Sequence, residues 1–343
     1  MIKKKKKIYY VVEPVNWSIN WDGRYITENI TRLFDQPAGV LKISRLRISR
    51  IRNQIIHFGS RGTYLPSNYK YVNEENDVIL TWFHGTDKDV NYIKLLPEVS
   101  KYLSVIHTSC TITANQLIKW GAEEKKIVVI PIGVDINLFK SIDSYNRKEI
   151  KKELGIPVNS VCIGSFQKDG EGWGEGDSPK FVKGPDVFCE VVKRLKERFP
   201  VFVLLSGPAR GFMKNKLQES GIPFKHLYLK NYPDITKLYR AIDIYIVTSR
   251  AEGGPKALLE SFASGVPLVS TDVGMVHDIG DNGYNAMVSR IDDVEGLTDN
   301  CRKIIESESL KKKIVMGGFE TVKNYDWRVI AERYYKEIYL RFL

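Results

Sequence analysis

Short runs of apolar residues alternate with amphipathic segments along most of the chain. Each run is dense in Val, Ile and aromatic residues and is bounded by Gly, Pro or polar residues, which predicts a buried strand. The strands predicted in the first part of the chain are residues 7–14, 53–59, 77–85 and 126–133. The helices predicted between them are residues 22–34, 86–95 and 110–121.

A second series of strands and helices follows a polar stretch at 134–158, where we place a linker. Its predicted strands are residues 161–166, 200–207, 226–230, 242–249, 266–271 and 285–289. Its predicted helices are residues 184–198, 232–241 and 255–264. Alternating helices and near-continuous apolar strands favour parallel sheets covered on both faces.

The expected fold class is therefore α/β, with two doubly wound domains. We expect an N-terminal domain at 1–140, completed by a C-terminal helix at 327–343, and a second domain at 141–326. In such sheets ligands bind beyond the carboxyl ends of the strands. The terminal helix is expected to present one apolar face formed by Val329, Ile330, Tyr334, Ile338 and Leu340.

The composition narrows the class of protein. The 343 residues are 43% hydrophobic and 27% charged, and no run approaches the roughly 20 apolar residues that span a bilayer. The N-terminus has no signal-peptide pattern, so we expect a cytoplasmic location. The four cysteines form no CxxC pair, which argues against a zinc ribbon or a disulfide scaffold.

A net charge of +11 predicts a negatively charged partner. Lys3–Lys7 form one basic run, and Lys42, Arg45, Arg47, Arg50 and Arg52 form a second one interleaved with apolar residues. Two interpretations remain open: a solvated terminus with an ordinary exposed helix, or peripheral contact with an anionic membrane surface. No specific nucleic-acid partner is expected, because no recognised binding module accompanies the charge.

The most informative stretch is 249–274, which begins at the end of a predicted strand. Gly253 and Gly254 allow close approach of a ligand to the backbone, and Pro255 suits the first helical position. The amides of Lys256 and Ala257 would then lie at a helix N-terminus, where phosphate is attracted.

Two carboxylates bracket this turn, Glu252 before the helix and Glu260 within it. Carboxylate oxygens accept hydrogen bonds, so the pair is suited to binding hydroxyl groups on both sides of a phosphate. The alternative is a solvated residue and a helix cap, with no ligand.

Five segments in the same order along the chain resemble the retaining nucleotide-sugar glycosyltransferases of the GT-B fold, the glycosyltransferase family four type with an E-x7-E motif. The resemblance covers residues 105–343 well and the first hundred loosely. It implies that the two doubly wound domains are Rossmann-like and face a cleft. The five segments are KIVVIPIGVDINLF at 126–139, KGPDVFCEVVKRL at 183–195, EGGPKALLE and its continuation at 252–274, DNGYNAMV at 281–288 and DWRVIAERYYKEIY at 326–339.

This resemblance implies a hexosyltransferase that moves a sugar from a nucleoside-diphosphate sugar to a hydroxyl acceptor with retention and without a metal or other cofactor. Glu252 would contact the donor sugar, Glu260 the ribose, and the amides from Gly254 to Ala257 the pyrophosphate. Lys183 would neutralise the leaving phosphate. His84 would hydrogen-bond a donor hydroxyl from the N-terminal domain. The acceptor would be a glycan, a lipid-linked molecule or a small molecule, met in the cytoplasm or at the cytoplasmic membrane face.

The sequence departs from the family's pattern at Ser165, where the family usually carries an arginine. An extra loop, 170–182, precedes Lys183. Lys168, Lys180 and Arg210 are candidates for the replacement cation. The loop itself is either a mobile lid with Trp173 at its tip or a plain solvated loop.

We expect no metal site. The acidic residues of the extra loop are spaced like a calcium loop, but Lys180 stands where a bidentate Glu is needed. His57, His107, His226 and His277 are not spaced as metal ligands and are interpreted as structural, with the acceptor side as an alternative for His57.

Two rival functions remain: a nucleotide-sugar-binding protein without transferase activity, and a GT-B-fold sugar-nucleotide epimerase or phosphorylase.

Overall fold

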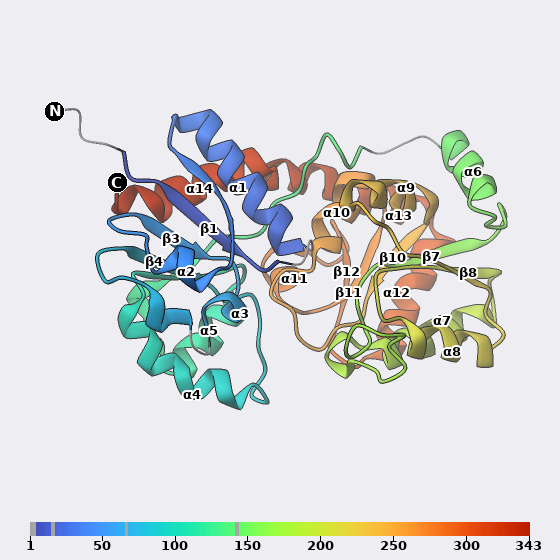
Figure 1. Cartoon of the computed structure of the whole chain (residues 1–343). Coiled ribbons are helices and arrows are strands. Elements are labelled where there is room, and N and C mark those ends of the chain that lie inside the picture. The colour runs from blue at the N-terminus through green and yellow to red at the C-terminus, as the bar shows by residue number, and fades with distance from the viewer. Residues whose placement is uncertain (1–4, 15–17, 66–67, 141–143) are drawn as a thin grey trace. The chain divides into compact units, whose positions relative to one another are not determined.

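The chain forms two compact units in the computed structural model (Figure 1), which describes residues 5–14, 18–65, 68–140 and 144–343. Unit 1 comprises Met1–Gly133 and Asn324–Leu343, and unit 2 comprises Val134–Lys323. Both observed boundaries lie a few residues before the expected ones at 140 and 326. The assignment of acceptor and donor roles to the two units stays a prediction.

Unit 1 is built on a parallel sheet with strand order β2-β1-β3-β4-β5-β6. Figure 1 shows α1 and α14 on one side of this sheet and α4 and α5 on the other. The strands are β1 (Ile8–Val12), β2 (Ala38–Lys42), β3 (Ile55–Phe58), β4 (Asp77–Thr81), β5 (Val105–Thr108) and β6 (Ile127–Val129). The helices are α1 (Ser18–Phe34), α2 (Arg45–Ile48), α3 (Arg61–Tyr64), α4 (Val90–Val99), α5 (Thr111–Lys119) and α14 (Trp327–Glu337).

Unit 2 is built on a second parallel sheet, with strand order β12-β11-β10-β7-β8-β9. Its strands are β7 (Val161–Ser165), β8 (Val201–Ser206), β9 (Phe224–Leu227), β10 (Ile244–Val247), β11 (Leu268–Thr271) and β12 (Met287–Ser289). Its helices are α6 (Ser144–Glu153), α7 (Pro185–Lys196), α8 (Gly211–Glu219), α9 (Ile235–Ala241), α10 (Lys256–Ser264), α11 (Met275–Ile279), α12 (Val294–Glu306) and α13 (Glu308–Val322). The expected α/β class with two doubly wound domains is confirmed.

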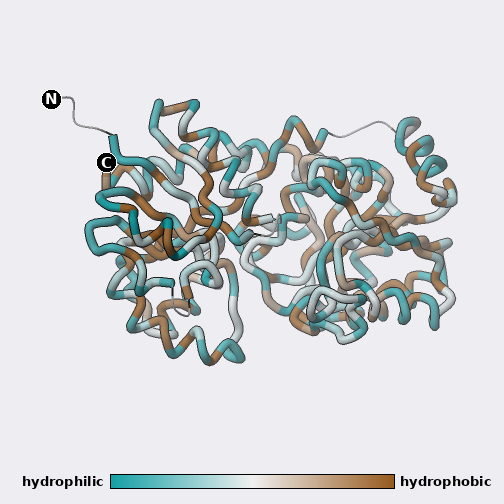
Figure 2. The backbone as a smooth tube through the Cα atoms, in the orientation of Figure 1, coloured by the Kyte–Doolittle hydropathy of each residue, from teal (hydrophilic) through white to brown (hydrophobic). Residues whose placement is uncertain are grey.

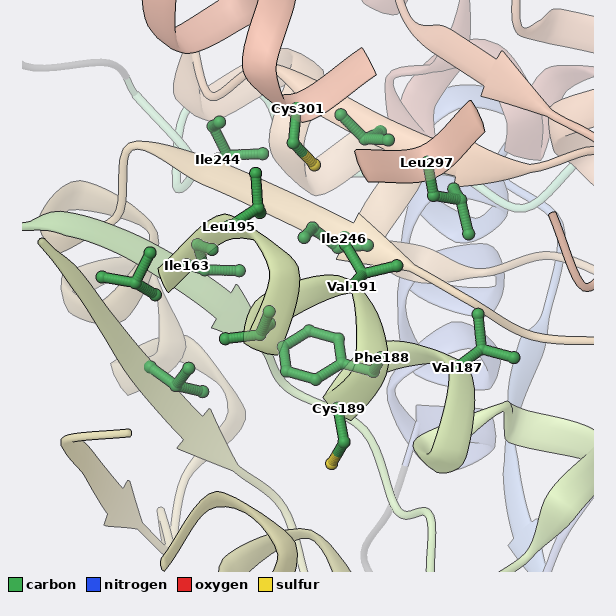
Figure 3. Close-up of a cluster of buried hydrophobic side chains, with 14 of the residues drawn as sticks. Ile163, Val187, Phe188, Cys189, Val191, Leu195, Ile244, Ile246, Leu297 and Cys301 are labelled. Atoms are coloured by element: carbon green, nitrogen blue, oxygen red, sulfur yellow. The ribbon is translucent and has the colours of Figure 1, made fainter. Parts of the chain in front are cut away.

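The core of unit 2 lies where α7 and α12 cover the sheet (Figure 3). Phe188 and Leu195 of α7 and Leu297 of α12 are buried against strand residues such as Ile163 and Ile246. Figure 2 shows apolar stretches of the backbone along the central strands of each unit. None of the helices in the described part of the chain combines the length and apolar composition that a membrane crossing requires.

The C-terminal segment packs on α1 within unit 1. The ring of Trp327 stacks on Tyr25 at 5.4 Å between centroids, and Phe34 stacks on Tyr335 at 3.9 Å. A Cβ at Gly133 would lie 2.6 Å from Trp327, so only glycine fits beneath the indole. These contacts fix the last helix to the unit that begins the chain.

The expected apolar face of this terminal helix is only partly correct. Ile330, Tyr334 and Ile338 are buried, whereas Val329 and Leu340 are 39% and 53% exposed. The helix ends at Glu337, so helical spacing no longer applies at Leu340. Val329 directly precedes the buried Ile330, and neighbouring helical residues point in different directions.

Several elements were not predicted from the sequence, among them the short helices α3 and α11. Strand β2 is an edge strand whose residues are all partly exposed, so it lacks a strong apolar run. Helix α6 lies inside the expected linker and is almost entirely polar. Helix α8 is likewise weakly amphipathic, with Gly211, Met213 and Leu217 as its buried residues. Only Arg45–Ile48 of the basic segment 42–52 is helical.

A fully buried polar network joins the sheet of unit 1 to the C-terminal segment. His57 is hydrogen-bonded to Thr81 at 2.7 Å and to Tyr339 at 2.6 Å. Thr81 continues to His107 at 2.9 Å, whose other nitrogen lies 2.9 Å from the carbonyl oxygen of Ile130. The alternative that His57 lines an acceptor site is disfavoured, because this side chain is fully buried.

Burial lowers the pKa of both histidines. The pKa of His107 falls to about 4, and that of His57 lies well below its usual value because of burial and the neighbouring His107. Below about pH 6.5 the unfolded chain therefore binds protons that the folded chain does not. The free energy of unfolding of unit 1 should decrease as the pH falls from 6.5 towards 4, by about 1.4 kcal/mol per pH unit for each histidine.

Urea unfolding followed by tryptophan fluorescence tests this prediction, since Trp82, Trp120 and Trp327 lie in unit 1. A His57→Gln/His107→Gln variant should be less stable at pH 7.5 but show a shallower pH dependence. His277→Gln, at an exposed position in unit 2, should keep the wild-type slope. An unchanged slope in the double variant would contradict the assignment.

Candidate functional site

An ion pair at the carboxyl edge of the second sheet forms the centre of the candidate site. The Nζ of Lys183 lies 2.6 Å from Oε1 of Glu252, and these side chains are 16% and 8% exposed. The buried Ser249 hydroxyl donates to the same carboxylate oxygen at 2.8 Å. Two residues predicted from the sequence are therefore in direct contact, held where β10 leads into its loop.

Gly184 positions Lys183 next to this loop. It follows the 3-10 turn η4 (Phe181–Lys183) and has φ +63. The Thr248 hydroxyl donates to the Gly184 carbonyl at 2.8 Å. A Cβ at Gly184 would lie 1.9 Å from the Thr248 carbonyl oxygen, so both the conformation and the close approach require glycine.

Arg250 ties the same two segments together from the other end. Its amide donates to the Val182 carbonyl at 2.8 Å, and its guanidinium binds both oxygens of Asp186, at 2.9 and 2.7 Å. Although partial burial acts to raise it, the pKa of Asp186 lies below its usual range because Arg250 hydrogen-bonds the carboxylate. These bonds thus hold the loop before α7 and the loop after β10 together.

The second carboxylate, Glu260, accepts hydrogen bonds from two phenols. Tyr239 donates to Oε2 at 2.8 Å, and Tyr232 donates to Oε1. Burial and the charge of Glu260 raise the pKa of Tyr239, so its hydroxyl remains a donor. Lys256 lies over the Tyr232 ring, 5.2 Å from its centroid. Glu260 is therefore a buried carboxylate arranged to accept hydroxyl groups.

The loop that contains Gly253 and Gly254, called the glycine loop below, lies against the start of α11. The Met275 amide donates to the Gly253 carbonyl at 2.8 Å, and a Cβ at Gly274 would lie 2.3 Å from that oxygen. Gly254 continues this loop to Pro255, which is the N-cap residue of α10 rather than its first helical residue as expected. Lys256 and Ala257 are the first residues of the helix, and the Pro255 side chain makes no capping hydrogen bond.

Arg210 fills the space beside Ser165, but as a fully buried residue. Its guanidinium donates to the carbonyl oxygens of Ser165, Gln167 and Ser206 and to the Ser165 hydroxyl, at 2.5 to 3.0 Å. Its Nε lies 3.0 Å from Oδ1 of Asp169. Burial raises the pKa of Asp169 to about 6, although the charge of Arg210 acts to lower it. In this arrangement Arg210 fixes backbone turns and presents no cation to solvent.

The extra loop is anchored to the neighbouring helix α8. The amides of Gly211 and Phe212 donate to the carbonyl oxygens of Glu175 and Gly176, at 2.6 and 2.9 Å. The loop thus caps the N-terminus of α8. Its Trp173 is 58% exposed, and the Nζ of Lys168 lies 4.0 Å from the Trp173 ring. Among the described residues, no group of three or more His, Cys, Asp or Glu is placed to hold a metal ion.

His84 belongs to unit 1, in the segment after β4, where it is half-buried. It is close enough to Asp89 to affect the pKa of that carboxyl, which lies below its usual range despite partial burial, mainly because of Thr86 and Arg61. The proposed contact of His84 with a donor sugar stays a prediction.

Several contributors to the site were missed from the sequence, among them Ser249 and Tyr239. Ser249 stands three residues before Glu252, a local Ser-x-x-Glu spacing that could have suggested their hydrogen bond. Tyr239 carries no such signal, because it reaches Glu260 only through the packing of α9 on α10.

One family model matches a segment in the second half of the chain. Residues 179–320 match the model described as "Glycosyl transferases group 1". This segment contains the Lys183–Glu252 pair, the glycine loop and Glu260.

Two curated relatives are sugar transferases by name. The lipopolysaccharide core biosynthesis mannosyltransferase LpsB of Rhizobium meliloti (strain 1021) is 26% identical over 181 residues, 50% of this chain and 48% of that protein. The UDP-Gal:alpha-D-GlcNAc-diphosphoundecaprenol alpha-1,3-galactosyltransferase of Escherichia coli is 27% identical over 269 residues, 71% of this chain and 65% of that one. The chain thus spans between 48% and 65% of the length of these two relatives.

Among solved structures, Anabaena Alr3699/HepE in complex with UDP and glucose has a TM-score of 0.81 at 14% identity, covering 98% of this chain and 100% of that one. Sucrose-phosphate synthase from Thermosynechococcus elongatus has a TM-score of 0.78 at 11% identity, over 98% and 100%. At such identities these similarities concern the fold.

The fold is that of the GT-B glycosyltransferases, with two Rossmann-like domains. Within it, residues 179–320 match the model of the group 1 glycosyl transferases. The resemblance found in the sequence is thereby confirmed at the level of the GT-B glycosyltransferase class.

A pair of glycine substitutions tests how the site is positioned. Gly184 and Gly172 have nearly equal φ, +63 and +67, but a Cβ at Gly172 meets nothing within 4 Å. Gly172→Ala should cost about 1 kcal/mol of backbone strain. Gly184→Ala should cost several kcal/mol, because the clash with Thr248 adds to that strain.

Thermal unfolding of the two variants measures the difference, with Gly172→Ala as the matched control. Equal shifts in Tm would show that Gly184 does not need its close approach to Thr248.

Proposed function

We propose that this chain transfers a sugar from a nucleoside-diphosphate sugar to a hydroxyl acceptor, with retention of anomeric configuration. The observation that carries the proposal is the pairing of Lys183 with Glu252 beside a second buried carboxylate, Glu260, that already accepts two hydroxyls. The names of similar proteins, which include a UDP-Gal-dependent transferase and a protein solved with UDP and glucose, support this donor class.

The proposal assigns one donor group to each part of the site. Ribose hydroxyls replace the Tyr232 phenol on Glu260, while Tyr239 keeps its hydrogen bond and orients the carboxylate. The diphosphate lies at the N-terminus of α10, where partial positive charge favours an anion. Lys183 turns from Glu252 to the phosphate next to the sugar, and Glu252 becomes free to accept a donor-sugar hydroxyl.

In the transfer step, the bond between the anomeric carbon and the phosphate oxygen breaks, and a bond to the acceptor oxygen forms on the same face. The departing phosphate oxygen takes the acceptor proton. No side chain is then required as a strong base, and the main demand on the protein is to stabilise negative charge on the leaving group. Lysines and helix amides supply that stabilisation, so we propose that the reaction needs no metal or other cofactor.

Substitution of Glu252 tests the proposal. Glu252→Gln and Glu252→Ala should lower sugar transfer, or release of nucleoside diphosphate from the donor, by about a hundredfold or more. The donor is first chosen by thermal-shift screening against UDP-, GDP- and ADP-sugars. Glu320→Gln, at an exposed position of α13 in the same unit, is the control.

Wild-type turnover in the Glu252 variants, with an unchanged Tm, would refute this role. Donor binding without turnover in the wild type would favour the binding-protein alternative. Interconversion of the donor sugar without release of nucleotide would favour the epimerase.

We also propose that unit 1 contacts an anionic membrane surface through the basic segment 42–52. Arg45, Arg47 and Arg50 are exposed around Leu46, whose exposure is 61%. The Arg45 guanidinium lies over the Tyr71 ring at 5.0 Å, which adds an exposed aromatic residue to the patch. A basic surface with exposed apolar side chains fits anionic lipid headgroups.

The other basic run contributes less. Within it, Lys5 pairs with Asp35 at 2.8 Å and Lys6 with Asp77 at 2.9 Å, while Lys3 and Lys4 lie outside the described residues. The named acceptors of two relatives are diphosphoundecaprenol lipids, which supports an acceptor found at a membrane. We propose that the chain meets it at the cytoplasmic face.

Liposome flotation tests the membrane contact. With vesicles containing phosphatidylglycerol, the Arg45→Glu/Arg47→Glu/Arg50→Glu variant should bind more weakly by at least about 3 kcal/mol, at roughly 1 kcal/mol per basic residue. Reversal of three exposed lysines of unit 2, Lys193, Lys303 and Lys312, is the charge-matched control. Flotation that is indifferent to the Arg45, Arg47 and Arg50 reversals would contradict the contact.

A further inference from the structure

We infer that Arg210 is a positioning residue for Lys183. Its buried guanidinium fixes the turn that follows β7, and this turn holds the backbone of Lys183 by two separate connections. The inference rests on the proposed function, since Lys183 is the lysine assigned there to the donor phosphate. It gives Arg210 a part in donor binding that needs no contact with the donor.

The guanidinium of Arg210 joins the turn after β7 to the turn after β8. Its Nη1 donates to the carbonyl oxygens of Ser165 and Gln167 in the first turn, at 2.8 and 2.5 Å, and to that of Ser206, the last residue of β8, at 2.7 Å. Its Nη2 donates to the Ser165 hydroxyl at 3.0 Å. Loss of the guanidinium would remove a donor from each of these groups, which is costly where they are buried.

Gln167 makes the first connection from this turn to Lys183. While its carbonyl oxygen accepts from Arg210, its side-chain Nε2 donates to the Lys183 carbonyl at 3.3 Å. Gly207, with φ +94, lets the turn after β8 approach closely, because a Cβ there would lie 3.0 Å from the Gln167 carbonyl oxygen. Gln167 thus binds the arginine through its backbone and the lysine segment through its side chain.

Asp169 makes the second connection. Its Oδ1 lies 3.0 Å from Nε of Arg210, and both side chains are fully buried. Its carbonyl oxygen accepts from the Lys180 amide at 2.7 Å, and the Lys180 carbonyl accepts from the Lys183 amide at 2.8 Å. The amide and the carbonyl of Lys183 are therefore both held from the turn that Arg210 fixes.

A fixed backbone matters for the Lys183 side chain because that side chain is long. Lysine has a flexible four-carbon stem, and ordering it on a ligand costs conformational entropy. From its present backbone position the Nζ reaches Glu252 at 2.6 Å. A cation that starts from a fixed position loses less freedom when a phosphate binds, so the anchored backbone favours donor binding.

The chemistry of arginine suits this task. A guanidinium carries five N–H donors in one plane, whereas an ammonium carries three donors on one atom. Arg210→Lys therefore keeps a charge beside Asp169 but cannot reproduce the bonds to both turns. Burial of a charged pair is by itself weak evidence for a role in stability. The test must nevertheless separate positioning from stability.

Isothermal titration calorimetry on the full chain tests the inference, with the tightest binder among UDP, GDP and ADP as the probe. Gln167→Ala removes the side-chain bond to Lys183 and leaves the carbonyl that Arg210 binds. It should weaken diphosphate binding about fivefold, equivalent to about 1 kcal/mol for one hydrogen bond. Arg210→Lys should weaken binding at least as much. Gln218→Ala, at an exposed position of α8, is the matched control and should bind as the wild type does.

A double-mutant cycle separates positioning from a structural role. In a Lys183→Gln background, Gln167→Ala and Arg210→Lys should cause no further loss of affinity, because both act through Lys183. A loss of the same size in both backgrounds would overturn the inference. Equal binding by the wild type and Gln167→Ala would also overturn it, and this comparison decides the matter if Arg210→Lys does not fold.

Failure of the proposed function gives a different result. If the wild type binds none of the three diphosphates, the proposed function fails. If Lys183→Gln binds as well as the wild type, the role proposed for Lys183 fails and the inference fails with it. If the wild type binds, Lys183→Gln binds more weakly and Gln167→Ala has no effect, the inference fails and the proposed function stands.

Discussion

The arrangement of unit 2 depends on keeping a lysine and a glutamate together in a nearly closed environment. Taking both charges of the Lys183–Glu252 pair out of water is costly, and their attraction compensates only if the geometry is held and other hydrogen bonds are made. Ser249 provides one such bond, and the contact of Gly184 with Thr248 holds the lysine in place. An ion pair whose desolvation is this costly is well suited to exchange partners when a charged ligand binds.

The two carboxylates of the site differ in what surrounds them. Glu252 faces a cation, whereas Glu260 accepts hydrogen bonds from two phenols. In the proposed function, Glu252 binds the reacting end of the donor and Glu260 binds its ribose. The glycine loop and the first turn of α10 separate these environments, so the loop conformation and the helix geometry together set the distance between them.

Much of the fold could be predicted because parallel strands buried on both faces leave long apolar runs, as in Val201–Ser206 and Ile55–Phe58. Edge strand β2 and the polar helix α6 bury little, so the sequence carries no comparable signal there. Within the site, Glu252 and Glu260 were identified from the local pattern of the chain, and Lys183 from the family resemblance. The burial of Arg210 and the reach of Tyr239 to Glu260 depend on contacts between distant segments, which spacing does not reveal.

The central rearrangement that we expect is the displacement of Lys183 from Glu252 by a bound diphosphate. A crystal structure with bound UDP-glucose, or with the sugar nucleotide that thermal shift selects, measures this directly. The predicted result is Lys183 on a phosphate oxygen, Glu252 within hydrogen-bond distance of a sugar hydroxyl, and a ribose hydroxyl in place of the Tyr232 phenol on Glu260. A nucleotide bound elsewhere, with the Lys183–Glu252 and Tyr232–Glu260 contacts unchanged, would contradict the account.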